Sequence, residues 1–247
     1  MPNPSGEFAA GLPADQPRAA TTPPNPPEFR EQPPDEGAAP EESSRYRGRE
    51  LVEAATAILG SEPAAAERML VRALEIGVGA LTAEQFARLR SLVVTAIAQQ
   101  PGRETDLAAA ALAAARDWAD ISAGDAAHHT VIAARIHYRG GDYRCAADLF
   151  AEALNRGELP YPPEEIAVLY ELLGRCLDAD QRYRAAARAY AAGADTIADR
   201  PQWAELHTDL TSAAARSRRL ARHPGAAVRE WARTSRPDAA GSLPESR

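Results

Sequence analysis

Three histidines in the middle of the chain are the side chains best suited to metal binding or acid–base chemistry. His128, His129 and His137 fall on one expected helix, and the last two are eight residues apart. That spacing separates them by about 12 Å along the helix axis, which is too far to share a metal ion. His128 and His129 are adjacent and point in different directions. We therefore expect surface or packing roles for all three.

The two cysteines, Cys145 and Cys176, are too few for a disulfide framework, and each falls within an expected helix. A zinc site would need more histidine or cysteine ligands close by in the sequence. We expect both cysteines to pack as small apolar residues, and we expect neither a metal nor a cofactor.

The sequence holds no G-x-S-x-G elbow, phosphate-binding loop, H-E-x-x-H motif or paired Cys/His nucleophile. We therefore do not expect an enzyme. The formal net charge of −7 argues against nucleic-acid binding, which usually needs a basic stripe. The most basic stretch, residues 216–223, has no nucleic-acid-binding motif beside it, and arginines near a helix C-terminus also complement the helix dipole.

Composition also bears on where the protein works. No run of eighteen apolar residues predicts a membrane span, and the N-terminus lacks the basic start and apolar core of a signal peptide. We expect a cytoplasmic protein. The chain has no lysine and is rich in alanine, as is typical of GC-rich bacterial genomes such as those of actinobacteria.

Proline and apolar spacing divide the chain into three parts. Residues 1–43 hold 11 of the 20 prolines and predict a disordered acidic tail. Residues 44–236 show helical spacing, and residues 237–247 predict a second, short disordered tail. Glycine and proline punctuation divides the helical part into ten expected helices, at residues 45–59, 63–76, 83–99, 103–119, 124–139, 142–156, 164–178, 181–198, 202–221 and 225–235.

A four-point pattern recurs five times along the helical part. A small residue is followed by another twelve positions later, a large apolar residue four later and a small residue three later. The small residues let two helices approach closely, and the large residue packs against the next pair. Because one hairpin cannot bury its apolar face alone, we expect an all-α solenoid of five antiparallel hairpins. The copies are Ala54–Ala66–Leu70–Ala73, Ala96–Ala108–Leu112–Ala115, Ala134–Ala146–Phe150–Ala153, Gly174–Ala186–Tyr190–Gly193 and Ala215–Ala227–Trp231–Thr234.

The fourth copy resembles the tetratricopeptide repeat, and the third matches it in its second half. The matching residues are Tyr170, Leu173, Gly174, Tyr183, Ala186 and Tyr190 in the fourth copy, and Gly141, Asp142, Tyr143, Ala146, Phe150 and Ala153 in the third. The copies start 38 to 42 residues apart, whereas the family repeats every 34. The resemblance, which covers about residues 45–235, is to a divergent type found in bacterial regulators.

The resemblance implies that the first helices of the hairpins line a concave, peptide-binding groove. The residue after the first small residue would point into it: Ala55, Ile97, Arg135, Arg175 and Arg216. Neighbouring groove positions are His128, Tyr138, Arg139, Glu171, Asp178, Asp209 and Arg219. Convergent arginines favour an acidic or phosphorylated peptide. The alternative is a solvated face whose arginines pair with acids such as Glu171 and Asp178.

We therefore expect an adaptor, scaffold or chaperone-like module that binds a protein segment, with acidic segments favoured. The alternative is a transcription-associated regulator that has no DNA-binding motif of its own and acts through a partner or as a homodimer. One acidic segment belongs to the chain itself, because residues 31–42 carry five acids. Tethering favours docking of this segment in the groove, and we hypothesise weak self-masking.

Overall fold

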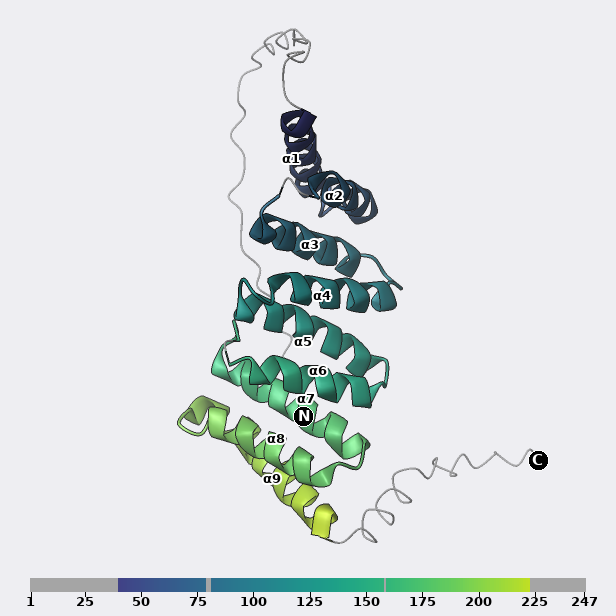
Figure 1. Ribbon diagram of the computed structural model, residues 1–247. Helices are drawn as coiled ribbons and strands as arrows, with labels where there is room; N and C mark the ends of the chain where they lie inside the picture. The colour runs from purple at the N-terminus through teal and green to yellow at the C-terminus, as the bar shows by residue number, and fades with distance from the viewer. Residues whose placement is uncertain (1–39, 79–80, 158, 223–247) are drawn as a thin grey trace, which may run out of the picture. The chain divides into compact units, whose positions relative to one another are not determined.

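The computed structural model describes residues 40–78, 81–157 and 159–222, and within them it is all-helical, with no strand (Figure 1). None of the described helices combines the length and apolar character needed to cross a membrane. The helices are α1 (Pro40–Ile58), α2 (Pro63–Gly77), α3 (Ala83–Ala98), α4 (Glu104–Trp118), α5 (Ala123–Arg139), α6 (Tyr143–Asn155), α7 (Pro163–Ala179), α8 (Tyr183–Thr196) and α9 (Ala204–Arg222), with a short 3₁₀ turn at Pro201–Trp203.

These helices confirm nine of the ten that the sequence predicts, and apart from the start of α1 each end lies within two residues of its expected position. The local signals act as expected. Thr82 caps α3 through a reciprocal pair of hydrogen bonds with Gln85, and Pro163 occupies the first turn of α7. The tenth predicted helix, at 225–235, lies outside the described residues.

The start of α1 differs from its prediction, since the helix begins at Pro40, inside the stretch predicted to be a tail. Proline is favoured at the first position of a helix because it has no N–H that needs a partner there. The remaining tail, residues 1–39, and the C-terminal tail, residues 237–247, lie outside the described residues.

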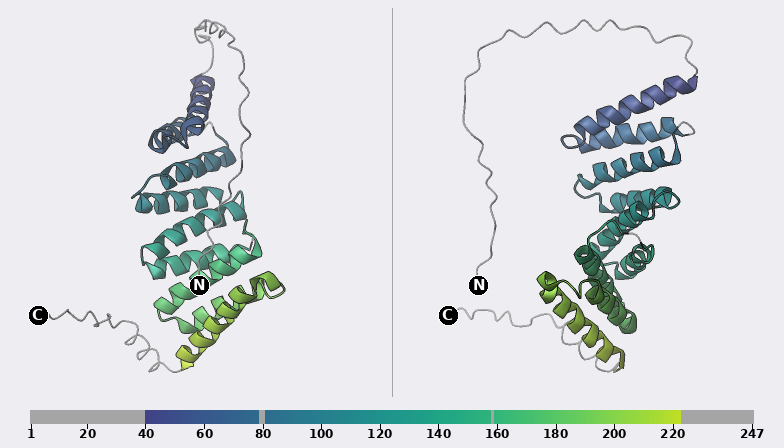
Figure 2. Two further views of the ribbon diagram at one scale, coloured as in Figure 1. Left: turned by 180° about the vertical axis from the view of Figure 1, so that it is seen from behind. Right: turned by 90° about the vertical axis from the view of Figure 1, so that its left-hand side faces the viewer.

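Helices that follow one another in the chain pack against one another, from α1 to α9 (Figures 1 and 2). Short turns make each pair antiparallel, so α1–α2, α3–α4, α5–α6 and α7–α8 form four hairpins, and α9 packs on α8. In the α5–α6 turn, Gly141 has φ +79°, a left-handed conformation that favours glycine. This is the expected all-α solenoid, with four complete hairpins and the first helix of the fifth in the described part.

The four-point pattern marks the closest packing in the third and fourth hairpins. Ala134, Ala146, Phe150 and Ala153 are fully buried in one core, which also contains the fourth copy's Tyr190. A Cβ added to Gly174 would lie 2.6 Å from the ring of Tyr190. The side chain four residues after the second small residue therefore fills the space that the first helix leaves open.

The pattern is displaced in the other copies. In the first copy Ala55 is buried and Ala54 exposed, so the packing residue lies one position later than predicted. In the second copy Ala111 is fully buried and Leu112 only half-buried. Alanine is so frequent that neighbouring alanines fit the pattern equally well. Of the fifth copy only Ala215, half-buried, lies within the described residues.

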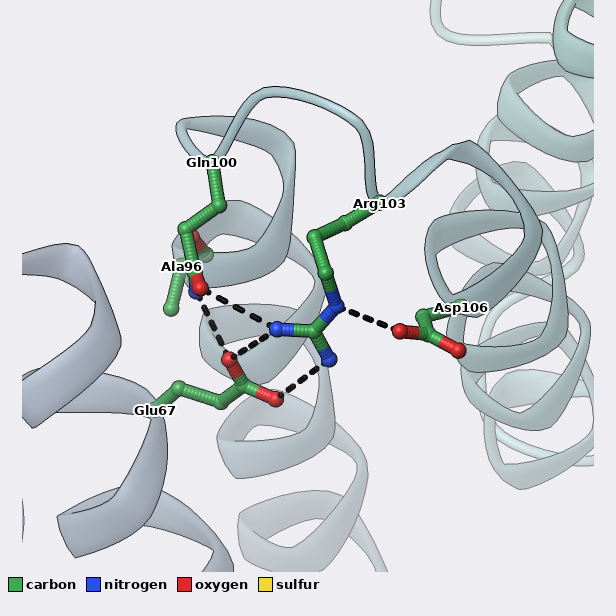
Figure 3. Close-up of polar contacts among 5 residues, drawn as sticks. All are labelled: Glu67, Ala96, Gln100, Arg103 and Asp106. Atoms are coloured by element: carbon green, nitrogen blue, oxygen red, sulfur yellow. Dashed lines mark hydrogen bonds and ion pairs between the residues drawn. The ribbon is translucent and has the colours of Figure 1, made fainter.

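A polar network fastens the first hairpin to the second (Figure 3). The Glu67 carboxylate, on α2, accepts two parallel N–H bonds of 3.2 Å from Arg103, which precedes α4. Gln100, at the end of α3, donates to the same carboxylate at 2.6 Å. Arg103 also donates to Asp106. A bidentate arginine–carboxylate pair that is also hydrogen-bonded fixes geometry as well as charge, so the network sets the junction between these hairpins.

Candidate functional site

Three of the five expected groove positions are exposed arginines: Arg135 on α5, Arg175 on α7 and Arg216 on α9. We call these three residues the arginine strip. The other two expectations are wrong, because Ala55 and Ile97 are buried in the core of the first two hairpins. Both misses follow from the displaced register of those copies.

The burial pattern locates the equivalent position in the second hairpin. Around Arg135 and Arg175 the order is two buried residues, the exposed arginine and a buried residue. Val93, Val94, Thr95 and Ala96 repeat that order on α3, so Thr95 lies at the equivalent position, forty residues before Arg135. The arginine strip is therefore confined to the later first helices.

Electrostatic effects link members of the strip across hairpins. Hydrogen bonding to Tyr138, on α5, and then the charge of Glu171 raise the pKa of Arg175. Glu171 lies one turn before Arg175 and is 2.5 Å from its guanidinium. Beyond Arg175, both Arg216 and Arg175 act to lower the pKa of Tyr190. Arg175 thus lies between Tyr138 on one side and the surroundings of Arg216 on the other.

Asp178 connects three helices. Its carboxylate accepts bonds of 2.8 and 3.0 Å from the Ser217 hydroxyl of α9 and one of 3.2 Å from the Tyr190 hydroxyl of α8. Burial raises the pKa of Asp178, whereas Ser217, Tyr190 and Arg216 act to lower it. These bonds use much of the acceptor capacity of the carboxylate, so Asp178 fixes α9 against α7 and α8.

His128 lies at the other end of the strip, near Arg135. Its Nδ1 is 2.7 Å from the hydroxyl of Tyr161, which lies in the α6–α7 connection. Burial lowers the pKa of His128, and the positive charge of Arg135 lowers it further. Burial also raises the pKa of Tyr161. Both rings are neutral near pH 7, so they offer hydrogen bonds and aromatic surface beside the Arg135 charge.

Arg139, on α5, and Arg219, on α9, are exposed, as predicted for the groove, and so is Asp209. Within the described residues no ion pair joins Arg135, Arg139, Arg216 or Arg219 to an acid. Arg175 alone has its expected partner, Glu171. The strip thus carries positive charge that the described chain does not neutralise.

A second group of arginines lines a hollow of about 340 Å³ between α8 and α9. We call it the arginine hollow; its lining consists of Arg184, Ala187, Arg188, Arg218, Ala221 and Arg222. Sequence reasoning missed it, because it combines residues from two helices that the groove alignment did not consider. The hollow is a rival location for an acidic ligand.

His129 has a packing role, as the sequence predicts, in a buried polar cluster. Its Nε2 is 2.7 Å from the Ser91 hydroxyl, which also accepts a 2.9 Å bond from the indole N–H of Trp118. The His129 Nδ1 is buried without a hydrogen-bond partner in the described structure. Burial, with a smaller effect from His128, lowers the pKa of His129 to about 4. A neutral ring at this position joins α3, α4 and α5.

Comparison with known proteins does not identify this chain: no protein-family model matches it, and no curated protein is significantly similar to it.

Proposed function

We propose that the chain is a tetratricopeptide-like interaction module, not an enzyme, that binds an acidic segment of another protein along its first helices. The observation that carries this proposal is the arginine strip. Its three guanidinium groups recur at the same place on α5, α7 and α9, each beside residues that pack in the core. Arginine favours carboxylates because its planar fork donates two parallel hydrogen bonds.

Two neighbouring rings support a peptide ligand over a diffuse attraction of anions. Tyr138 is half-buried next to Arg175, and Tyr161 is half-buried near Arg135. Tyrosine adds apolar contact area and a hydroxyl at little cost in side-chain entropy. Acids of an extended segment would pair with the arginines while its backbone and apolar side chains pack on the tyrosines.

The test is direct binding of a synthetic peptide with the sequence of residues 31–42, followed by fluorescence anisotropy. The strip variant is Arg135→Ala, Arg175→Ala and Arg216→Ala in one chain. The control is Arg184→Ala, Arg188→Ala and Arg218→Ala, which changes the net charge equally but alters the arginine hollow. We expect the strip variant to lose most of the affinity and the control to retain it.

Other outcomes identify the failure. Equal loss in both variants means that the peptide responds only to net charge. Loss confined to the control variant moves the binding site to the arginine hollow. Affinity unchanged in both variants, with unchanged far-ultraviolet circular dichroism, contradicts an arginine-based site.

Self-masking is tested by removing residues 1–39, which leaves α1 whole. If the tethered segment occupies the strip, its removal raises the affinity for the added peptide, because the intramolecular competitor is gone. Unchanged affinity refutes self-masking and leaves the strip itself in place.

A further inference from the structure

Three side chains of metal-binding type meet at the turn that joins α5 to α6. His137 lies in the last turn of α5, Asp142 caps the N-terminus of α6 and Cys145 lies in the first turn of α6. One donor atom from each lies within 4.8 Å of the others: an imidazole nitrogen, a carboxylate oxygen and the thiol sulfur. The turn closes with a 3.0 Å bond from the Asp142 N–H to the His137 carbonyl.

The separations fit a small tetrahedral cation. Zinc binds nitrogen, oxygen and sulfur at about 2.0–2.3 Å, so its neighbouring donors lie about 3.3–3.6 Å apart. His137 Nδ1 and Asp142 Oδ2 are already 3.2 Å apart. The other oxygen of Asp142 accepts a 3.2 Å bond from the Cys145 N–H, which fixes the orientation of the carboxylate. Little rearrangement is needed to place all three donors around one ion.

We propose that His137, Asp142 and Cys145 bind a single Zn²⁺ ion, with solvent as the fourth ligand. A mixed set of imidazole, carboxylate and thiolate suits zinc, and three protein ligands plus water is the usual form of an open zinc site. The site is reachable from solvent, since the side chains of His137 and Asp142 are 28% and 55% exposed. It is separate from the arginine strip and independent of the proposed peptide binding.

Binding requires loss of the thiol proton. Burial, and then the charges of Asp142 and Asp148, raise the pKa of Cys145, so the metal-free side chain is a thiol near pH 7. The ion displaces this proton to solvent as the zinc–sulfur bond forms. Asp148, one turn further along α6, lies 3.6 Å from Arg182 of the next hairpin, and that arginine offsets part of its charge.

Cobalt(II) serves as the spectroscopic probe, added to the full chain without a histidine tag. We expect one ion per chain, a sulfur-to-cobalt charge-transfer band, and loss of both on addition of zinc. Cys145→Ser removes the band although Cys176 remains in the chain. Asp142→Asn weakens cobalt binding but leaves α6 capped, because asparagine is an equally good N-cap. His137→Gln weakens binding, whereas His207→Gln on α9 leaves it unchanged.

The proposal fails if cobalt does not saturate at one equivalent, or if the charge-transfer band persists in Cys145→Ser. It also fails if His207→Gln weakens binding as much as His137→Gln. Circular dichroism of each variant, compared with the parent chain, shows that loss of binding reflects loss of a ligand and not unfolding.

Discussion

Gly174 tests whether the small residues set the spacing of the hairpins. A Cβ at this position would lie 2.6 Å from two ring atoms of Tyr190 and 2.8 Å from a third. The ring cannot swing aside easily, because Tyr190 is buried and its hydroxyl donates a 3.2 Å hydrogen bond to Asp178. Gly174→Ala therefore forces α7 and α8 apart or strains the ring.

The magnitude follows from two opposing effects. Overpacking a well-packed core costs about 1–3 kcal/mol, and more where the neighbour is rigid. Alanine regains about 1 kcal/mol over glycine inside a helix. We expect Gly174→Ala to lower the free energy of unfolding by about 2 kcal/mol. Gly48→Ala, in α1, has nothing within 4 Å of its added Cβ and should raise that free energy by up to about 1 kcal/mol.

Urea unfolding followed by circular dichroism measures both variants, and a double-mutant cycle with Tyr190→Leu isolates the contact. If the ring is the obstacle, Gly174→Ala costs less in the Tyr190→Leu background than in the parent chain. Equal stabilisation by Gly174→Ala and Gly48→Ala would refute the packing account, because helix propensity alone would then explain both.

Two further predictions concern polar groups. Glu67→Ala should cost about 2–3 kcal/mol, because it removes a half-buried carboxylate that accepts three N–H bonds, whereas Glu75→Ala on the same helix removes only an exposed ion pair and should cost under about 0.5 kcal/mol; similar losses in urea unfolding would contradict the network. The His129 pKa of about 4 lies below the ordinary 6.5, so the unfolded chain binds a proton first as the pH falls. The stabilising effect of a neutral His129 is complete above pH 6.5 and is lost progressively down to about pH 4, by about 3 kcal/mol; His129→Gln should lack this loss and His207→Gln should keep it, and a pH profile shared by His129→Gln and the parent chain would contradict the prediction.

The helices and their order were predictable because the signals are local. Glycine and proline mark the turns, and the Thr82–Gln85 capping box lies within four residues of sequence. The exact register of the first two copies was not predictable. Ala54 and Ala55 are identical in size and type, and only their packing partners decide which one is buried.

Contacts between elements also escaped sequence reasoning. The helical spacing compares residues along one helix, and on that basis His137 has no partner. The structure pairs it with Asp142 and Cys145 across a turn. The partners of Asp178 are similarly distant, since Ser217 lies 39 residues later on α9. A histidine and a cysteine on either side of a Gly-Gly turn were the signal that could have indicated the first of these clusters.

The proposal that an acidic segment lies along the first helices is tested most directly by hydrogen exchange with and without the peptide of residues 31–42. Bound peptide should slow exchange in α5, α7 and α9, and the effect should vanish in the strip variant. Protection confined to α6 and α8, or no protection at saturating peptide, would contradict the proposed site.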